Sequence, residues 1–121
     1  MRFLAMVRSD PSAATGMPPQ ALMDAMEKLV QEGFQSGTLV DTGGLRFQGA
    51  RVRLRKGKVT VTDGPYAEAK EIIGGYAIME YPSQEEAVAA AVRFLELHRD
   101  HWPGWEGESE VRPMDSVPAP A

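Results

Sequence analysis

The amino-acid sequence predicts a single α+β domain in which an antiparallel sheet carries two helices on one face. Three observations predict it. The 121 residues are enough for one domain with a real core and too few for two of usual size. Apolar runs suited to strands are separated by two segments in which apolar residues recur at three- and four-residue spacing. Strand, helix, strand, hairpin, strand, helix and strand then follow in the order of a split βαβ arrangement.

The opening strand and the first helix come from the first third of the chain. Residues Phe3–Val7 form a short apolar run that offers side chains to both faces of a sheet, as a central strand does. Pro18 and Pro19 suit the first turn of a helix, and apolar residues then recur at helical spacing over Pro19–Gln35. We expect this helix to end at Gly37.

A short strand and a hairpin come next. We expect a strand over Thr38–Asp41, a turn over Thr42–Gly44 and a hairpin from about Ala50 to Thr62. The tip of the hairpin is predicted at Lys56-Gly57.

The two faces of this hairpin are expected to differ. With a two-residue loop, four apolar residues pair across the ladder and lie on one side: Val52, Leu54, Val59 and Val61. The basic residues between 51 and 58 alternate with apolar ones and share the other face. We expect that face to meet water rather than to bind anions.

The second half supplies a strand, a helix and a last strand. Residues Ile72–Tyr81 are apolar at both parities, which predicts a strand that needs cover on both faces. Ser83 and Glu86 form a capping-box pattern that opens a helix running to about His98. A last short strand is expected over Glu108–Arg112. This order is typical of a ferredoxin-like domain.

The two helices can cover only one face of the predicted sheet. Because the strands near Met6 and Ile78 are apolar on the other face too, a monomer would expose a larger apolar patch than soluble monomers tolerate. Pairing with a second copy would bury this patch. We therefore expect a homodimer packed sheet against sheet.

Composition excludes several classes of function. The net charge of −4 argues against a nucleic-acid surface, which needs an excess of Lys and Arg. The absence of cysteine excludes disulfides, thiolate nucleophiles and thiolate metal sites. The apolar run Phe3–Val7 is far shorter than a membrane span and lacks a signal-peptide cleavage pattern, so we expect a cytoplasmic protein with no membrane partner.

The densest group of ionisable side chains lies between the hairpin and the next strand, within Val61–Glu71. Asp63 either accepts backbone hydrogen bonds in this turn or transfers protons, and the two roles can coexist. Glu68, Lys70 and Glu71 either form a solvated cluster or line the mouth of the dimer cleft, where loss of water would shift their pKa values toward neutrality.

Two histidines and two tryptophans are further candidates. His98 and His101 are close enough on a helical turn to share a metal, but no third ligand stands at a diagnostic spacing, and we expect no metal. His98 is expected to support the helix C-terminus, where a cation is favourable, and it remains a candidate acid or base. Trp102 and Trp105 either cover an edge of the core or stack on a ligand.

The residues also carry a family resemblance. The segment Val61–Glu71, followed by Gly74-Gly75-Tyr76, resembles the signature of YCII-related proteins of the DGPF type, named for Asp-Gly-Pro-Phe. Residues Arg93–Gly107, closing on Glu110–Pro113, resemble one branch of that family. The resemblance covers nearly the whole chain, and we expect a YCII-related domain over residues 1–114 and a loose tail over residues 115–121.

The resemblance implies a small ferredoxin-like domain without a cofactor that assembles as a dimeric α/β barrel and has no generally established activity. Tyr66 stands where the name motif has phenylalanine. The wider group is thought to use a histidine of its first helix with an aspartate as a catalytic pair. Here the first helix, Pro19–Gln35, has no histidine.

Two functions remain open. In the first, a cleft beside the partner chain holds a small polar organic molecule, and the acidic turn moves protons without a cofactor. The candidate catalytic residues are Asp63, Glu68, Glu71 and His98, and the candidate ligand contacts are Tyr66, Lys70 and Trp102. In the second, the protein is a non-catalytic dimer that binds a small ligand or a regulatory protein. The resemblance implies a link to transcription, because relatives are often associated with sigma-factor-like regulators.

Overall fold

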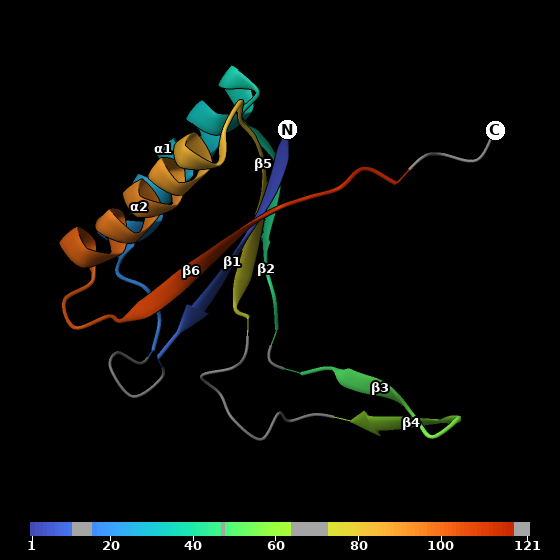
Figure 1. Ribbon diagram of the computed structural model, residues 1–121. Coiled ribbons are helices and arrows are strands. Elements are labelled where there is room, and N and C mark those ends of the chain that lie inside the picture. The colour runs from blue at the N-terminus through green and yellow to red at the C-terminus, as the bar shows by residue number, and fades with distance from the viewer. Residues whose placement is uncertain (11–15, 47, 64–72, 118–121) are drawn as a thin grey trace.

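A computed structural model describes residues 1–10, 16–46, 48–63 and 73–117 of the chain (Figure 1). Its elements are β1 (Arg2–Ser9), α1 (Gln20–Ser36), β2 (Leu39–Gly44), β3 (Ala50–Arg55), β4 (Lys58–Asp63), β5 (Gly75–Glu80), α2 (Gln84–His101) and β6 (Gly107–Pro113). The mixed α+β fold with an antiparallel sheet and two helices is confirmed, and it is consistent with a ferredoxin-like domain.

Four strands form the main sheet in the order β2-β5-β1-β6, with every neighbouring pair antiparallel. Both helices lie on the same face of it (Figure 1). On that face Phe3 lies opposite Met79 and Ala5 lies opposite Ala77, and Phe3, Ala5 and Met79 form the core with Ala87 of α2. The core is thus built from alternate residues of the two central strands.

Local signals end and begin the helices as predicted. Gly37 closes α1 with φ 78°, and its N–H donates to the carbonyl oxygen of Phe34 at 3.3 Å. At the start of α2, the Ser83 Oγ accepts from the Glu86 N–H at 3.3 Å, while the Ser83 hydroxyl reaches the Glu86 carboxylate at 3.2 Å. α2 then runs to His101, three residues past the end that we expected.

The turn expected over Thr42–Gly44 is instead the second half of β2. Thr42 pairs with Ala77, and Gly44 pairs with Gly75, so the ladder with β5 holds these residues in an extended form. Pairing with a strand more than 30 residues away overrides the local turn preference of two glycines.

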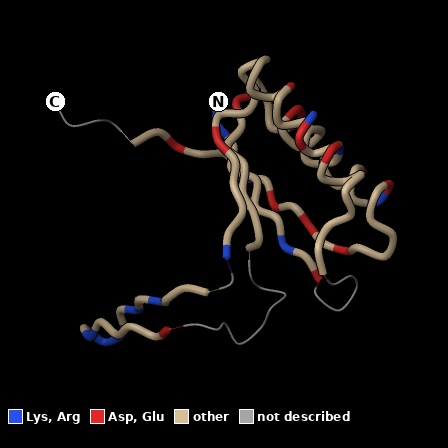
Figure 2. The backbone as a smooth tube through the Cα atoms, turned by 180° about the vertical axis from the view of Figure 1, so that it is seen from behind, with Lys and Arg blue, Asp and Glu red and all other residues tan. Residues whose placement is uncertain are grey.

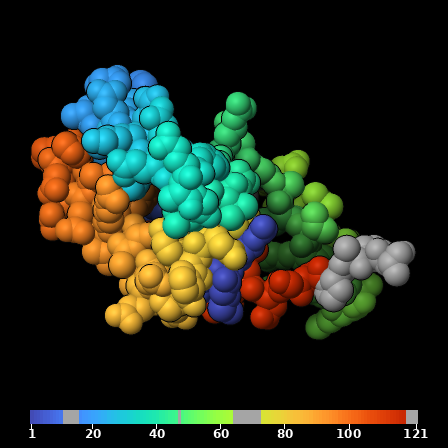
Figure 3. Space-filling model, turned by 90° about the horizontal axis from the view of Figure 1, so that it is seen from above, coloured from blue at the N-terminus to red at the C-terminus, as the bar shows by residue number. Residues whose placement is uncertain are grey.

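The hairpin of β3 and β4 stands apart from the main sheet. Its register pairs Val52 with Val61 and Leu54 with Val59, as predicted. Lys56 and Gly57 at its tip have φ values of 50° and 77°, which a two-residue hairpin loop requires. The hairpin projects from the end of the sheet on the side opposite the helices (Figure 1), and the view from above also places it (green) across the molecule from α2 (orange) (Figure 3).

The second face of the main sheet is not covered by either described helix. Because side chains alternate along a strand, it carries the residues between those of the core: Leu4, Met6, Tyr76 and Ile78, with Glu108, Glu110 and Arg112 on β6. We call this surface the open face. In the described part of the chain, neither helix combines the length and apolar composition needed to cross a bilayer.

Candidate functional site

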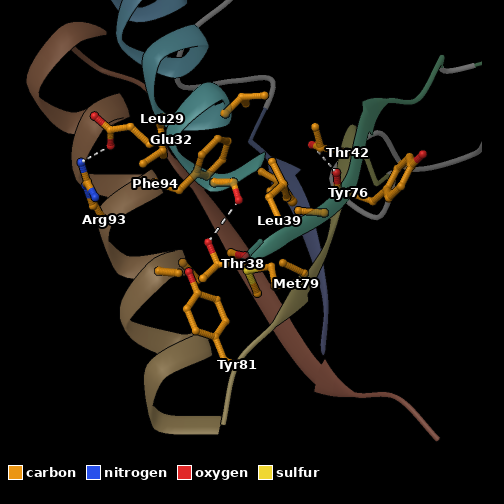
Figure 4. Close-up of a pocket in the computed structure, with 18 of the residues that line it drawn as sticks. Leu29, Glu32, Thr38, Leu39, Thr42, Tyr76, Met79, Tyr81, Arg93 and Phe94 are labelled. Atoms are coloured by element: carbon orange, nitrogen blue, oxygen red, sulfur yellow. Dashed lines mark hydrogen bonds and ion pairs between the residues drawn. The ribbon is translucent and has the colours of Figure 1, made fainter. Parts of the chain in front are cut away.

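A pocket of about 750 Å³ lies between the helices and the main sheet (Figure 4). Its position follows from how the helices pack. α1 contacts β2, whereas α2 contacts β6 and β1, so the helices rest mainly toward the two edges of the sheet. Strand β5, second from the β2 edge, contributes its helix-facing residues Gly75, Ala77 and Met79 to the pocket wall.

Small residues keep this space open. Gly75 and Ala77 on β5 and Ala89 and Ala90 on α2 all line the pocket, and none of them has a side chain long enough to fill it. Gly33 allows α1 to approach β2 so closely that an added Cβ would lie 2.8 Å from the Leu39 Cβ. The pocket is therefore a consequence of side-chain size at positions far apart in the sequence.

The wall of the pocket is mostly apolar. Leu29, Leu39, Met79 and Phe94 supply large apolar surfaces, and Figure 4 shows them gathered around the space between α1, α2 and β2. Tyr76 also borders the pocket, but its ring points away from it, and its hydroxyl donates to Asp41 Oδ2 at 3.0 Å. This hydrogen bond to a carboxylate raises the pKa of Tyr76.

Hydroxyl groups form one part of the polar lining, and charged side chains form the other. Thr42 Oγ1 donates to the Tyr76 carbonyl oxygen at 2.9 Å, and Thr38 Oγ1 lies 2.8 Å from Ser36 Oγ. The Tyr81 hydroxyl has no hydrogen-bond partner among the described residues. A bound molecule that carries an oxygen could therefore bond to Tyr81 without breaking an existing bond.

The carboxylates that border the pocket already have partners. Glu32 Oε2 lies 3.2 Å from the Arg93 guanidinium, which joins α1 to α2 at the pocket's edge (Figure 4). Glu86 takes part in the capping box with Ser83. Neither is an isolated base beside the apolar wall, so this lining is better suited to holding a molecule than to removing a proton from it.

Asp63, the first residue of the predicted acidic turn, lies at the end of β4 in the exposed hairpin and does not line the pocket. Tyr66, Glu68, Lys70 and Glu71 lie outside the described residues. Of the candidate catalytic residues that the structure describes, neither lines the pocket: Asp63 belongs to the hairpin and His98 to the far end of α2.

His98 is a buried part of the structure. It is 6% exposed, and its Nδ1 donates to the Phe94 carbonyl oxygen at 2.9 Å. Its ring centroid lies 4.4 Å from that of Trp105 and 4.6 Å from that of Phe94. Burial lowers the pKa of His98 below its usual range, only partly offset by the backbone hydrogen bond. This favours the neutral ring and is at odds with the cationic role that we expected.

The two tryptophans flank the turn after α2. Trp105 packs on His98 and so covers an edge of the core, which is one of the two roles that we considered. Trp102 donates its backbone N–H to the His98 carbonyl oxygen at 2.8 Å and does not line the pocket. Within the described ranges, no three metal-ligating side chains gather closely enough to hold a metal ion.

The residues of the pocket carry no signal in the sequence that marks them as one site. Their only local signal is small side chains, such as Gly33, Ala77 and Ala90, which also suit close packing in a core. In the sequence, Tyr81 stands at the end of a predicted strand. Seeing these residues as one site requires knowing that α1, β5 and α2 meet.

Comparison with curated proteins finds no significant match for the sequence. Among solved structures, the chain is similar to the 5-chloro-2-hydroxyhydroquinone dehydrochlorinase from Burkholderia phenoliruptrix AC1100 in complex with 2,5-dihydroxybenzoquinone. The identity is 16%, the TM-score is 0.51, and the similarity covers 97% of this chain and 96% of that chain, so the two share a fold. The family model of the YCII-related domain matches residues 1–94, and the chain belongs to this family.

Proposed function

We propose that this YCII-related domain is a homodimeric small-molecule-binding protein whose pocket takes an apolar ring compound bearing one or two hydroxyl or carbonyl groups. The observation that carries the proposal is the pocket of about 750 Å³ between the helices and the sheet. Its size lies in the range of small-molecule sites, which typically combine apolar walls with a few polar groups. The DGPF type within the family stays a prediction.

The lining supports this class of ligand. The Phe94 ring and the aliphatic side chains Leu29 and Leu39 suit an apolar or aromatic body. The Tyr81 hydroxyl suits one polar substituent. This ligand is less polar than the one that we expected from the sequence, because the charged residues at the pocket's edge, Glu32 and Arg93, are paired with each other.

The open face supports the homodimer. Leu4 and Met6 on β1 lie beside Tyr76 and Ile78 on β5, which makes an apolar strip along the two central strands. No described helix packs on it, and a continuous apolar strip of this kind is typical of an interface.

Binding can be tested with 1-naphthol as the probe, measured by isothermal titration calorimetry. The substitution Ala90→Phe places a ring in the pocket and should weaken binding at least tenfold. Val88→Phe is the matched control, because Val88 is 41% exposed on the same helix and does not line the pocket. Equal affinity of wild type and Ala90→Phe, or no binding by wild type, would contradict the proposal.

The contribution of the Tyr81 hydroxyl to binding can be tested separately. Tyr81→Phe removes one hydroxyl and should weaken binding of 1-naphthol about fivefold, corresponding to about 1 kcal/mol for one hydrogen bond. Binding of naphthalene, which has no polar atom, should not change. If both compounds lose affinity equally, Tyr81 contributes shape rather than a hydrogen bond.

A second candidate function is acid–base catalysis without a cofactor near the turn that begins at Asp63. It is favoured by the shared fold with a dehydrochlorinase, which is an argument from fold alone. The test is chloride release from 5-chloro-2-hydroxyhydroquinone by wild type and by Asp63→Asn. Release by wild type that falls at least 100-fold in Asp63→Asn would favour catalysis, whereas release at the uncatalysed rate by both would exclude this reaction.

A further inference from the structure

We propose that the β3–β4 hairpin is a membrane contact, whose apolar face enters the surface of a bilayer that contains anionic phospholipids. The inference is independent of the pocket and of the open face, because it uses neither surface. We expected no membrane partner because the apolar run Phe3–Val7 is too short to span a bilayer. That argument does not apply to an element that lies in the membrane interface without crossing it.

One face of the hairpin is apolar and uncovered. Val52 pairs with Val61, and Leu54 pairs with Val59, so the four side chains share this face. Their exposed fractions lie between 63% and 70%, so the described part of the chain leaves them open to solvent. Four large aliphatic side chains exposed side by side are typical of a surface that binds another protein or a membrane.

The opposite face of the hairpin is cationic. Alternation along the two strands places four basic residues there, and a fifth lies at the tip: Arg51, Arg53, Arg55 and Lys58, with Lys56. The one acid of the hairpin, Asp63, alternates onto the apolar side at its base. In amphipathic helices that bind membranes, the same division places the apolar face in the acyl boundary and the cations at the headgroups.

Several of these cations lack an acidic partner in the described part of the chain. The ion pairs found there include none of Arg53, Arg55 and Lys58. Arg55 lies directly opposite Lys58 across the ladder, and like charges at such positions destabilise a strand pair. An anionic surface beside the hairpin would remove this repulsion.

An anionic lipid surface accounts for both faces at once. Acyl chains cover the aliphatic side chains, while the anionic headgroups neutralise the cations. A protein layer packed on the apolar face would leave Arg55 and Lys58 opposite each other without an anion. A nucleic acid on the cationic face would leave Val52 and Leu54 in water. The bilayer is therefore the occupant that the two faces together favour.

The position of the hairpin suits contact with a surface. It projects from the end of the main sheet, and neither strand makes substantial contact with another described helix or strand (Figure 1). From Ala50 to Asp63 the chain has five basic residues and one acidic residue, although its total net charge is −4. Figure 2 shows these basic residues along the hairpin, while acidic residues are spread over the helices and the main sheet. An anionic bilayer therefore attracts the hairpin and repels the rest of the molecule.

The depth of insertion follows from the backbone. A two-stranded hairpin has unpaired N–H and C=O groups along both outer edges, and such groups are costly to place in hydrocarbon. The strands therefore lie at the level of the headgroups, and only the aliphatic side chains enter the acyl region. This cover also stabilises the hairpin, because two strands without a packed face are marginally stable in water.

Co-sedimentation of the full chain with vesicles tests the inference. The probe is a vesicle of phosphatidylcholine with about one third phosphatidylserine, which gives it an anionic surface. Wild type should bind, and Leu54→Glu, which places a charge on the apolar face, should bind at least tenfold more weakly. Val88→Glu is the matched control, because it adds the same charge at an exposed aliphatic position of α2 and should bind as wild type does. No binding by wild type, or equal binding by Leu54→Glu, would overturn the proposal.

The cationic face has its own test in the same assay. Lys58→Gln removes one cation and should weaken vesicle binding about fivefold, which corresponds to about 1 kcal/mol for one basic residue near an anionic leaflet. Lys28→Gln removes the same charge from an exposed position of α1 and should bind as wild type does. Equal losses in the two variants would mean that total charge, and not the hairpin, controls binding, and the proposal would fail.

Fluorescent labels report which face enters the bilayer, and labelling is specific because the natural chain has no cysteine. Leu54→Cys and Arg53→Cys, on opposite faces of the hairpin, are each labelled with a dye whose emission shifts to the blue in apolar surroundings. We expect vesicles to shift the label at residue 54 and to shift the label at residue 53 much less.

Two results would assign the hairpin to another partner and overturn the proposal. A label at residue 54 that is already shielded without vesicles, in a sample that sedimentation shows to be dimeric, would mean that a second copy covers the apolar face. Binding to a short DNA duplex, with no shift of that label on vesicles, would mean that the cationic face binds nucleic acid instead.

Discussion

Two antiparallel strand pairs of this protein carry similar apolar patterns and have opposite environments. In the pair β1 and β5, the helix-facing residues Phe3, Ala5 and Met79 are at most 6% exposed. In the pair β3 and β4, Val52 and Leu54 are 68% and 70% exposed. Apolar residues at every second position of a strand show which residues share a face, but they do not show what covers that face.

The largest effect expected from this comparison is on stability. Phe3→Ala should lower the free energy of unfolding by about 3–5 kcal/mol, because it leaves a cavity under α2. Leu54→Ala should change it by no more than about 0.5 kcal/mol in a sample dilute enough to be monomeric. Urea unfolding followed by circular dichroism measures both. A loss of several kcal/mol for Leu54→Ala in the monomer would show that its own chain already covers the apolar face of the β3–β4 hairpin.

Two glycines allow the same two regions to be compared at the level of the backbone: Gly33 in α1, which packs on the main sheet, and Gly57 at the tip of the exposed hairpin. Gly33→Ala should cost about 1–3 kcal/mol, because the new Cβ would lie 2.8 Å from the Leu39 Cβ and force α1 away from β2. This reverses the usual gain from replacing a helical glycine with alanine. Thermal unfolding monitored by circular dichroism measures the difference in stability between Gly33→Ala and wild type.

The matched substitution in the β3–β4 hairpin is Gly57→Asn. Gly57 has φ 77° and no atom within 4 Å of an added Cβ, and asparagine tolerates this conformation. It should cost well under 1 kcal/mol. If Gly33→Ala is as mild as Gly57→Asn, the close approach of α1 to β2 is not needed for the fold.

Much of the fold could be predicted because its signals are local. The Ser83 and Glu86 capping box, the Gly37 helix end and the Lys56-Gly57 hairpin tip each depend on residues within a few positions. The extension of β2 through Gly44 could not, because it depends on pairing with distant β5. Nor could the pocket, which exists because Gly33, Ala77 and Ala90 come together from three elements.

Charge density is easy to see in a sequence, and it predicts a candidate site at the turn after β4, of which the structure describes only Asp63. The pocket between the helices and the sheet is a separate feature with a mostly apolar wall, and Asp63 is not part of it. An exposed charge needs no partner to be stable, whereas a cavity in a core lowers stability and so requires an explanation. Small side chains around one space are therefore the more informative sign of a binding site. They can be recognised as a group only when it is known which helices and strands pack together.

Substitutions in the capping box of α2 measure how much this helix start contributes to the stability of the fold. Ser83→Ala removes the acceptor for the Glu86 N–H and should cost about 1 kcal/mol. Ser83→Asp restores an acceptor at the same position and should recover most of the loss. Both are measured by urea unfolding. Equal losses for Ala and Asp would indicate that the Ser83 hydroxyl acts as a donor to Glu86 rather than as a cap.

The smallest expected effect on stability is a pH dependence, because it comes from a single proton on His98. Burial lowers the pKa of His98, so below its ordinary value near 6.5 the unfolded chain binds more protons than the folded chain. Its contribution to stability is therefore largest above pH 6.5 and falls as the pH drops toward the lowered value. His98→Asn, whose side-chain amide can still donate to the Phe94 carbonyl, should show a weaker dependence of urea stability on pH over this interval.

His101→Asn is the control for that measurement, since it removes the other histidine of the same helix turn and should keep the pH dependence of the wild type. A pH dependence that is unchanged in His98→Asn and lost in His101→Asn would contradict the prediction. The β3–β4 hairpin has no histidine, so this acid sensitivity belongs to the helix layer and not to the hairpin. Mild acidification should therefore loosen the end of α2 around His98 and Trp105 before it affects the exposed apolar face of β3 and β4.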